Sequence, residues 1–192
     1  MNNPTLNIFI TGVGGQGIGL LSEALMRAYD YAGFPVKGVD THGLAQRGGC
    51  VVSHLRIGFE SGSPLIEEGK ADILLSLERS EAYRNMSRVL RRGGSLAYYD
   101  TVWQALPERL GVVGAVNREM IEAVAEERNL TVYFLENRPL EDGRMQNTAL
   151  LGFAFTKGVF PGLKLSHLIS SLEDLLPASV LEKNLKVLKG DV

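Results

Sequence analysis

The sequence predicts one α/β domain that spans residues 1–192, with helices on both faces of a mostly parallel sheet and a helical cluster at the C-terminal end. Short apolar runs with strand composition alternate with longer segments of helical periodicity along most of the chain. The length suits one domain, since a second hydrophobic core would leave too few residues for each. No internal repeat, low-complexity linker or block of like charges divides the chain, so the alternation indicates a single unit.

Seven segments have the pattern of short strands. They cover residues 6–11, 36–40, 50–59, 71–77, 95–100, 111–116 and 131–135. Helices are predicted over residues 16–32, 80–92 and 117–128, and the pattern from residue 146 onward is helical. The helix at 80–92 is expected to hold Arg88, Arg91 and Arg92 in its last turn, where cations offset the helix dipole, before Gly93 and Gly94 end it.

Charge and cysteine content exclude several classes of protein. The chain has 20 Lys and Arg against 22 Asp and Glu, a net charge of −2, so it lacks the basic excess that attracts nucleic acid or an anionic membrane. Cys50 is the only cysteine, which excludes an internal disulfide, a thiolate zinc site and a complete set of iron–sulfur ligands. No apolar run reaches the roughly 20 residues that span a bilayer, and the N-terminus lacks a signal-peptide pattern, so we expect a cytoplasmic protein.

A glycine-rich turn follows the first predicted strand. Residues 12–17 read G-x-G-x-x-G, with glycines at Gly12, Gly14, Gly15 and Gly17, and the predicted helix comes directly after them. In a Rossmann-like domain such glycines permit a tight turn, and the free amides of the helix N-terminus attract a phosphate. Asp40 ends the second strand, where an acid that binds a ribose would lie. The alternative is that the glycines only let the strand and the helix pack closely.

A second polar, glycine-rich segment, residues 40–49, does not belong to the dinucleotide pattern. The carboxyl ends of the strands in an open α/β sheet meet at one edge, so this loop and the glycine turn could line one crevice. Arg47 would offer a planar charge to a phosphate or carboxylate, while His42 and Gln46 would offer orienting hydrogen bonds. The alternative is a solvated turn, capped by Thr41 and opened by Gly48 and Gly49.

Other residues with chemical potential have structural interpretations. His54 alternates with its neighbours inside a predicted strand, and His167 lies in an otherwise apolar helix, so we expect structural or surface roles for both. The aromatic residues Tyr98, Tyr99 and Trp103 are expected in the core or an interface. A buried, inert thiol is expected at Cys50.

These segments resemble the gamma subunit or domain of 2-oxoacid:ferredoxin oxidoreductases, most closely the small beta subunits of the indolepyruvate-specific members. The resemblance rests on GVGGQGIGLLSEAL at residues 12–25 and DTHGLAQRGGCVVSHLRIG at residues 40–58. It extends to SPLI at residues 63–66, ADILLSLERSEA at residues 71–82, and Asn147 with the LLGFAF that follows.

The resemblance implies a subunit that holds none of the redox centres and no catalytic residue of its own. Thiamine diphosphate and the iron–sulfur clusters would lie in larger partner subunits, with ferredoxin reached through the complex, and the chain alone would be inactive. The glycine turn and the loop would form part of a coenzyme A or inter-subunit pocket, without a metal. The residues of that pocket would be Gly12, Gly14, Gly15, Gln16, Gly17, Thr41, His42, Gln46, Arg47, Gly48 and Gly49. Arg47 would contact the substrate carboxylate, a coenzyme A phosphate or an acidic group of a partner.

Two other functions are compatible with the residues. A stand-alone NAD(P)-dependent oxidoreductase would use the glycine turn and Asp40, although no proton-transfer motif accompanies them. A nucleotide-binding assembly protein without catalytic activity would use the same turn.

Overall fold

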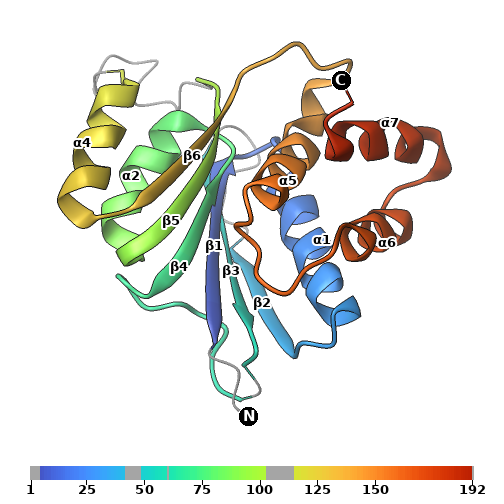
Figure 1. Ribbon diagram of the computed structural model, residues 1–192, viewed down its shortest axis with the longest axis horizontal. Helices are drawn as coiled ribbons and strands as arrows, with labels where there is room; N and C mark the ends of the chain where they lie inside the picture. The colour runs from blue at the N-terminus through green and yellow to red at the C-terminus, as the bar shows by residue number, and fades with distance from the viewer. Residues whose placement is uncertain (1–4, 42–48, 60, 103–114, 192) are drawn as a thin grey trace.

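A computed structural model describes residues 5–41, 49–59, 61–102 and 115–191 (Figure 1). Within these ranges six strands form one sheet in the order β2-β3-β1-β4-β5-β6. Their bounds are Leu6–Val13 for β1, Val36–Thr41 for β2, Cys50–Ile57 for β3, Ala71–Ser76 for β4, Leu90–Asp100 for β5 and Thr131–Glu136 for β6. Strands β1, β4, β5 and β6 are parallel neighbours, whereas β3 runs antiparallel to both β1 and β2. The predicted, mostly parallel sheet is confirmed, and β3 is its exception.

Helices cover both faces of the sheet, as predicted. On one face lie α1 (Ile18–Tyr31), α5 (Gln146–Thr156), α6 (Leu165–Leu175) and α7 (Ala178–Lys189), after a short 3₁₀ turn at Gly143–Met145. On the other lie α2 (Arg79–Val89) and α4 (Arg118–Arg128), at the left of Figure 1. None of the helices in the described ranges is long and apolar enough to cross a bilayer.

The central strands bury side chains on both faces. Ile8, Ile10 and Leu75 lie in the cluster beneath α1, whereas Phe9 and Leu74 lie in the cluster beneath α2. Successive residues of a strand point to opposite faces, and both faces are covered here. The near-continuous apolar runs of the first and fourth strands follow from this double burial.

The helix predicted to end at residue 92 is shorter. Helix α2 ends at Val89, and the buried Leu90 already pairs with Ala71 of β4, so β5 begins there rather than at residue 95. Arg91 and Arg92 therefore lie in a strand and do not cap the helix. Arg91 Nε donates to Asp72 Oδ1 at 2.6 Å, and Arg92 Nη2 donates to the Glu127 carbonyl at 2.8 Å. Strand pairing with β4 overrides the local signal that the two glycines provide.

The strand predicted at residues 111–116 lies mostly outside the described residues, and the described Ala115 and Val116 belong to no strand. The helix predicted to follow Asn117 is confirmed. The Asn117 side chain accepts the Met120 N–H at 3.0 Å and caps α4.

Helices α5 and α7 pack closely together at Gly152. A Cβ atom at this position would lie 2.0 Å from the Leu188 carbonyl oxygen. We expect Gly152→Ala to lower the free energy of unfolding by about 2–3 kcal/mol, because the helices must separate to admit the methyl group. Chemical denaturation measures this change. Gly143→Ala is the control, since a Cβ there has no atom within 4 Å. An equal effect of the two substitutions would contradict the packing argument.

Candidate functional site

At the carboxyl edge of the sheet, the chain continues from β1 to one face of the sheet and from β4 to the other face. These strands are parallel neighbours, yet β1 leads into α1 on one face and β4 leads into α2 on the other. In open α/β sheets, ligands bind outside the carboxyl ends of the strands at such a switch point. The predicted glycine turn follows β1 at this switch point, and residues 77–79 follow β4.

The Gln16 side chain joins the glycine turn to the end of β4. Its buried side-chain oxygen accepts the Val13 N–H at 2.8 Å, and its side-chain nitrogen donates to the Leu77 carbonyl at 2.8 Å. The same nitrogen lies 3.4 Å from Gln146 Oε1 at the start of α5. The Gln16 amide therefore holds the turn in place through contacts within the protein.

Two of the motif glycines are packing positions. A Cβ on Gly12 would lie 2.9 Å from Gln16 Oε1 and 3.2 Å from Leu77 Cβ. Gly17 has a φ of +78°, and a Cβ there would lie 2.4 Å from Asn147 Nδ2. That nitrogen donates to the Gly17 carbonyl at 3.1 Å. Asn147 thus ties α5 to the beginning of α1, so the close-packing interpretation holds for these two glycines.

The other two motif glycines lie at the surface end of the turn, where Gly15 is exposed and Gly14 is half-buried. Gly15 has a φ of +102°, and a Cβ there would meet no atom within 4 Å. The Gly14 N–H donates to the Gly49 carbonyl at 2.9 Å. Gly49, at the end of the 40–49 loop, therefore contacts the glycine turn. The antiparallel register that pairs Val13 with Cys50 brings the two segments together.

The N-terminus of α1 has no side-chain cap on Gly17 and no acidic residue in its first turn. Asp40 lies beside this turn instead: its Oδ1 accepts the Ser22 hydroxyl at 2.9 Å, and a Cβ on Gly19 would lie 3.9 Å from its Oδ2. The carboxylate of Asp40 is thus placed to offset the positive end of the α1 dipole.

Several predicted site residues lie outside the described ranges. These are His42, Gln46, Arg47 and Gly48, together with the side chain of Thr41. Trp103 is also outside. The segments 42–48 and 103–114 both connect to the described chain at the carboxyl edge, since the first follows β2 and the second follows β5.

A polar cluster at the carboxyl end of β1 was not predicted. It consists of the buried residues Thr11, Glu81 and Asn85 together with Cys50. Asn85 Nδ2 lies 3.4 Å from both Thr11 Oγ1 and Glu81 Oε2, and Thr11 Oγ1 lies 3.6 Å from Cys50 Sγ. Glu81 is fully buried and pairs with Arg84.

A second buried acid, Glu78, caps α2. Its side chain accepts the Glu81 N–H at 2.8 Å, and the Ser76 hydroxyl donates to its carbonyl at 2.7 Å. One signal in the sequence could have identified both acids: they follow the buried strand 71–76 directly, at the carboxyl end where ligand-binding residues of parallel sheets gather.

Cys50 is exposed as a residue, so the prediction of a buried cysteine is wrong. Its position at the start of β3, next to the loop, explains the exposure. Its sulfur atom nevertheless lies beside Thr11 and the Glu81 carboxylate. Partial burial of the sulfur, together with Glu81, raises the pKa of Cys50 to about 11. The sulfur therefore stays a thiol at neutral pH.

Asp100, at the end of β5, holds two arginines together. It accepts Arg79 Nε at 2.5 Å and Arg118 Nε at 2.6 Å, and its side chain is only 2% exposed. Burial alone would raise the pKa of Asp100, but the hydrogen bonds from Arg79 and Arg118 outweigh it and lower the pKa below its ordinary value. The arginines are the first residues of α2 and α4, so this ion pair anchors both helices to the sheet.

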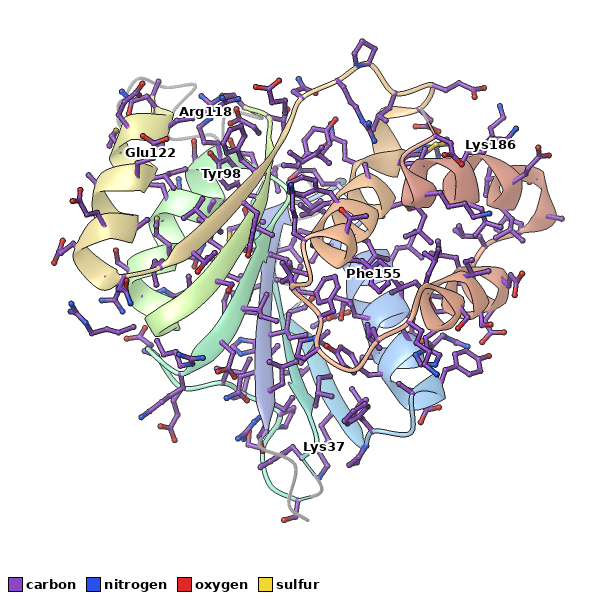
Figure 2. All side chains as sticks on the ribbon, viewed as in Figure 1. Lys37, Tyr98, Arg118, Glu122, Phe155 and Lys186 are labelled. Atoms are coloured by element: carbon purple, nitrogen blue, oxygen red, sulfur yellow. The ribbon has the colours of Figure 1, made fainter. Side chains whose placement is uncertain are left out.

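The aromatic residues at this end have structural roles, as expected. Tyr98 and Tyr99 are buried, and the Tyr99 hydroxyl lies 3.3 Å from the Arg138 carbonyl. Figure 2 shows Tyr98 near Arg118, whose guanidinium lies 4.2 Å from the Phe134 ring centre.

The two histidines in the described ranges also have structural roles. His54 Nδ1 accepts the Ile66 N–H at 3.0 Å, and burial lowers the pKa of His54. His167 Nδ1 accepts the Lys164 N–H at 3.2 Å at the start of α6.

The chain is similar in sequence to a known family and to named proteins. Residues 7–190 match the family described as pyruvate ferredoxin/flavodoxin oxidoreductase. Over 189 residues the chain is 32% identical to indolepyruvate oxidoreductase subunit IorB of Archaeoglobus fulgidus. The aligned region covers 96% of this chain and 92% of the relative. It is 30% identical over 185 residues to the subunit IorB of Pyrococcus horikoshii, covering 94% of this chain and 91% of the relative.

Solved structures share the fold. The gamma subunit of a keto/oxoacid ferredoxin oxidoreductase from Geobacter sulfurreducens superposes with a TM-score of 0.65 at 18% identity, over 96% of this chain and 94% of that one. Pyruvate oxidoreductase subunit PORC of Thermotoga maritima superposes with a TM-score of 0.66 at 19% identity, over 98% of this chain and 95% of that one. A 2-oxoglutarate:ferredoxin oxidoreductase from Magnetococcus marinus gives 0.65 at 18% identity, over 98% of this chain and 30% of that one. These likenesses confirm the predicted fold class.

We expect Asp100→Asn to lower the free energy of unfolding by about 2 kcal/mol at neutral pH, because two guanidiniums lose a buried charged partner. The pKa of Asp100 is lowered in the folded protein, so its contribution is present above about pH 4 and is lost as the pH falls through the lowered pKa. Urea unfolding of both proteins across this range measures the difference. The exposed Asp30→Asn is the control. A difference that does not shrink at any acid pH at which the wild type still folds would contradict this assignment.

We expect the rate at which iodoacetamide alkylates Cys50 to keep rising above pH 9, with a midpoint at about 11. Glu81→Gln should lower the pKa of the thiol and accelerate alkylation at neutral pH, since it removes a nearby negative charge. Mass spectrometry follows the single adduct, and Cys50→Ser supplies the blank. A rate that is already constant by about pH 8 would show an activated thiol and refute the assigned environment.

Proposed function

Because the chain belongs to the pyruvate ferredoxin/flavodoxin oxidoreductase family, we propose that it is a subunit of a coenzyme A-dependent 2-oxoacid:ferredoxin oxidoreductase, with aryl pyruvates as its substrate class. The observation that carries the proposal is the match to subunits named for indolepyruvate oxidoreductase over nearly the full length of both chains. The complex would oxidatively decarboxylate the 2-oxoacid, pass electrons to ferredoxin and work in the cytoplasm.

We assign the redox chemistry to partner subunits. An iron–sulfur cluster needs about four cysteine ligands, and this chain has one cysteine. The buried acids of the carboxyl edge are also occupied within the chain: Glu81 pairs with Arg84, and Asp100 pairs with Arg79 and Arg118. In this proposal thiamine diphosphate and the clusters lie in the larger subunits, and this chain contributes a pocket and an interface.

The glycine turn and the loop 41–49 are the proposed pocket. Three observations support it: Gly15 is open to its surroundings, α1 begins without a side-chain cap, and Gly14 contacts Gly49 at the end of the loop. The α1 amides would hold an anionic group of coenzyme A, whose thiol accepts the acyl group when bound. Gln16 would keep the turn in shape, and Arg47 would contact a coenzyme A phosphate, the substrate carboxylate or a partner's acid.

Reconstitution tests the subunit assignment. The purified chain, supplied with thiamine diphosphate, an aryl pyruvate, coenzyme A and an electron acceptor, should show no turnover. Addition of the larger subunit should restore activity. Robust turnover by the chain alone, or hydride transfer with NAD(P)H bound at micromolar affinity, would overturn the proposal in favour of a dehydrogenase.

Kinetics of the reconstituted complex test the pocket. We expect Gly15→Ala to raise KM for coenzyme A by about tenfold, because a side chain intrudes where the backbone should approach the ligand. Gly33→Ala is a matched control, since Gly33 also has a positive φ and open space but lies beyond the other end of α1. Equal effects of the two substitutions would exclude the turn as a ligand site.

Arg47→Ala distinguishes the three contacts proposed for Arg47. A rise in KM for coenzyme A alone assigns it to the phosphate, and a rise in KM for the 2-oxoacid alone assigns it to the carboxylate. Weaker association with the larger subunit assigns it to a partner's acidic group. Arg92→Ala, on β5, is the control for loss of an arginine. Activity and assembly that match the wild type would remove Arg47 from the pocket.

A further inference from the structure

Asn147 contacts the glycine turn from a distant part of the chain. It is the second residue of α5, and it is 3% exposed. Its Nδ2 atom donates to the Gly17 carbonyl at 3.1 Å, across 130 residues of sequence, and its Oδ1 atom accepts the Thr148 N–H at 2.7 Å. A carbonyl only accepts and an N–H only donates, so these two partners fix the direction in which the amide group faces.

The local sequence does not fix the backbone where α1 begins. Gln16 is the only residue with a side-chain carbon in positions 14–17, and no side chain caps the helix at Gly17. Gly17 has a φ of +78°. Because glycine adopts positive and negative φ with similar ease, the peptide group that follows Gly17 can rotate at little cost. A contact from elsewhere in the fold must hold this peptide group.

The Gly17 carbonyl accepts two hydrogen bonds. Besides the bond from Asn147 Nδ2, it accepts the Leu21 N–H at 3.1 Å, which is the first bond of α1. A carbonyl oxygen has two lone pairs, and both are engaged here. In a planar trans peptide the C=O and the following N–H point in opposite directions. The held carbonyl therefore fixes the Ile18 N–H in the direction that leads out of the N-terminal end of α1.

The first residue of α5 contacts the same turn. Gln146 is 8% exposed, and its Oε1 atom lies 3.4 Å from Gln16 Nε2. The first two residues of α5 thus contact two residues of the turn, Gln16 and Gly17. The beginning of α5 supports the side of the turn that leads into α1, while the bonds of Gln16 to Val13 and Leu77 support the side that leaves β1.

We propose that Asn147 is a positioning residue for coenzyme A. By holding the Gly17 carbonyl, it keeps the Ile18 N–H in the direction that an anionic group of the ligand requires. The inference rests on the proposed function, because coenzyme A as the ligand of the glycine turn is part of that proposal. It adds that the C-terminal helical cluster, through α5, sets the affinity of the turn together with the glycines.

Nuclear magnetic resonance of the full-length chain tests the positioning without coenzyme A. In Asn147→Ala the amide signals of Ile18 and Gly19 should shift. Asn184→Ala is the matched control, since Asn184 is 5% exposed and its side chain bonds to Thr148 and Val180. Its Ile18 and Gly19 signals should stay at the wild-type positions. Unmoved signals in Asn147→Ala, or equal shifts in the two variants, would overturn the positioning role.

A second variant removes only the donor. Asn147→Asp keeps an acceptor for the Thr148 N–H and places a negative charge in the first turn of α5, where the helix dipole favours it. This variant should fold and should shift the same two amide signals. Wild-type signals in Asn147→Asp would show that the bond to Gly17 does not hold the peptide group.

Kinetics of the reconstituted complex test the consequence for coenzyme A. Asn147→Ala should raise KM for coenzyme A by about tenfold and leave kcat within about twofold, because Asn147 orients a binding group and touches no reacting atom. Asn184→Ala should keep the wild-type KM. A lower kcat at unchanged KM, or equal changes of KM in the two variants, would indicate a general structural role and overturn the proposal.

Gly15→Ala separates this inference from the proposed function. If KM for coenzyme A rises in Gly15→Ala but not in Asn147→Ala, the pocket stands and the role of Asn147 is refuted. If the Ile18 signal shifts in Asn147→Ala while neither substitution changes KM, the glycine turn does not bind coenzyme A, and the proposed pocket is refuted together with the inference.

Discussion

The hydrogen bonds of the Gln16 side chain are the constraint on which the carboxyl edge depends. This buried amide accepts the Val13 N–H and donates to the Leu77 carbonyl, so it joins the end of β1 to the end of β4. A buried amide without these partners would cost about 1–3 kcal/mol, whereas a satisfied one holds its neighbours in a single arrangement. The ends of β1 and β4 are therefore held together, and α1 and α2 begin at fixed positions after them.

The buried carboxylates at this edge obey a similar requirement. Glu78 accepts an amide of α2, Glu81 pairs with Arg84, and Asp100 holds two arginines. A charge removed from water is tolerated only when it is paired and hydrogen-bonded, and Glu81 and Asp100 have arginine partners within the described residues. These carboxylates hold the beginnings of α2 and α4 in place at this edge of the sheet. In the proposed pocket, an anion would be recognised by the backbone amides of the glycine turn and by Arg47 of the adjoining loop.

The two edges of the sheet offer different chemistry. The carboxyl edge presents an outward-facing glycine turn beside an uncapped helix N-terminus, which suits a phosphate-bearing ligand approached by backbone. The amino edge has a cavity lined by apolar side chains and by the ion pair of Arg91 with Asp72. The family relationship bears on the first edge, because the glycine turn and the loop carry the resemblance. The second edge is understood only from its own side chains.

The sequence by itself determined the fold class, the glycine turn and most helices and strands, because these depend on local patterns: apolar periodicity, glycines that permit tight turns, and caps such as Asn117. Only the tertiary structure decided that β3 runs antiparallel between β1 and β2, and that β5 begins at Leu90. It alone decided that Asp100 holds arginines 21 and 18 residues away. Hydrogen-bond ladders and buried ion pairs join segments far apart in the chain, and their free energy depends on which segments meet, which no local pattern records.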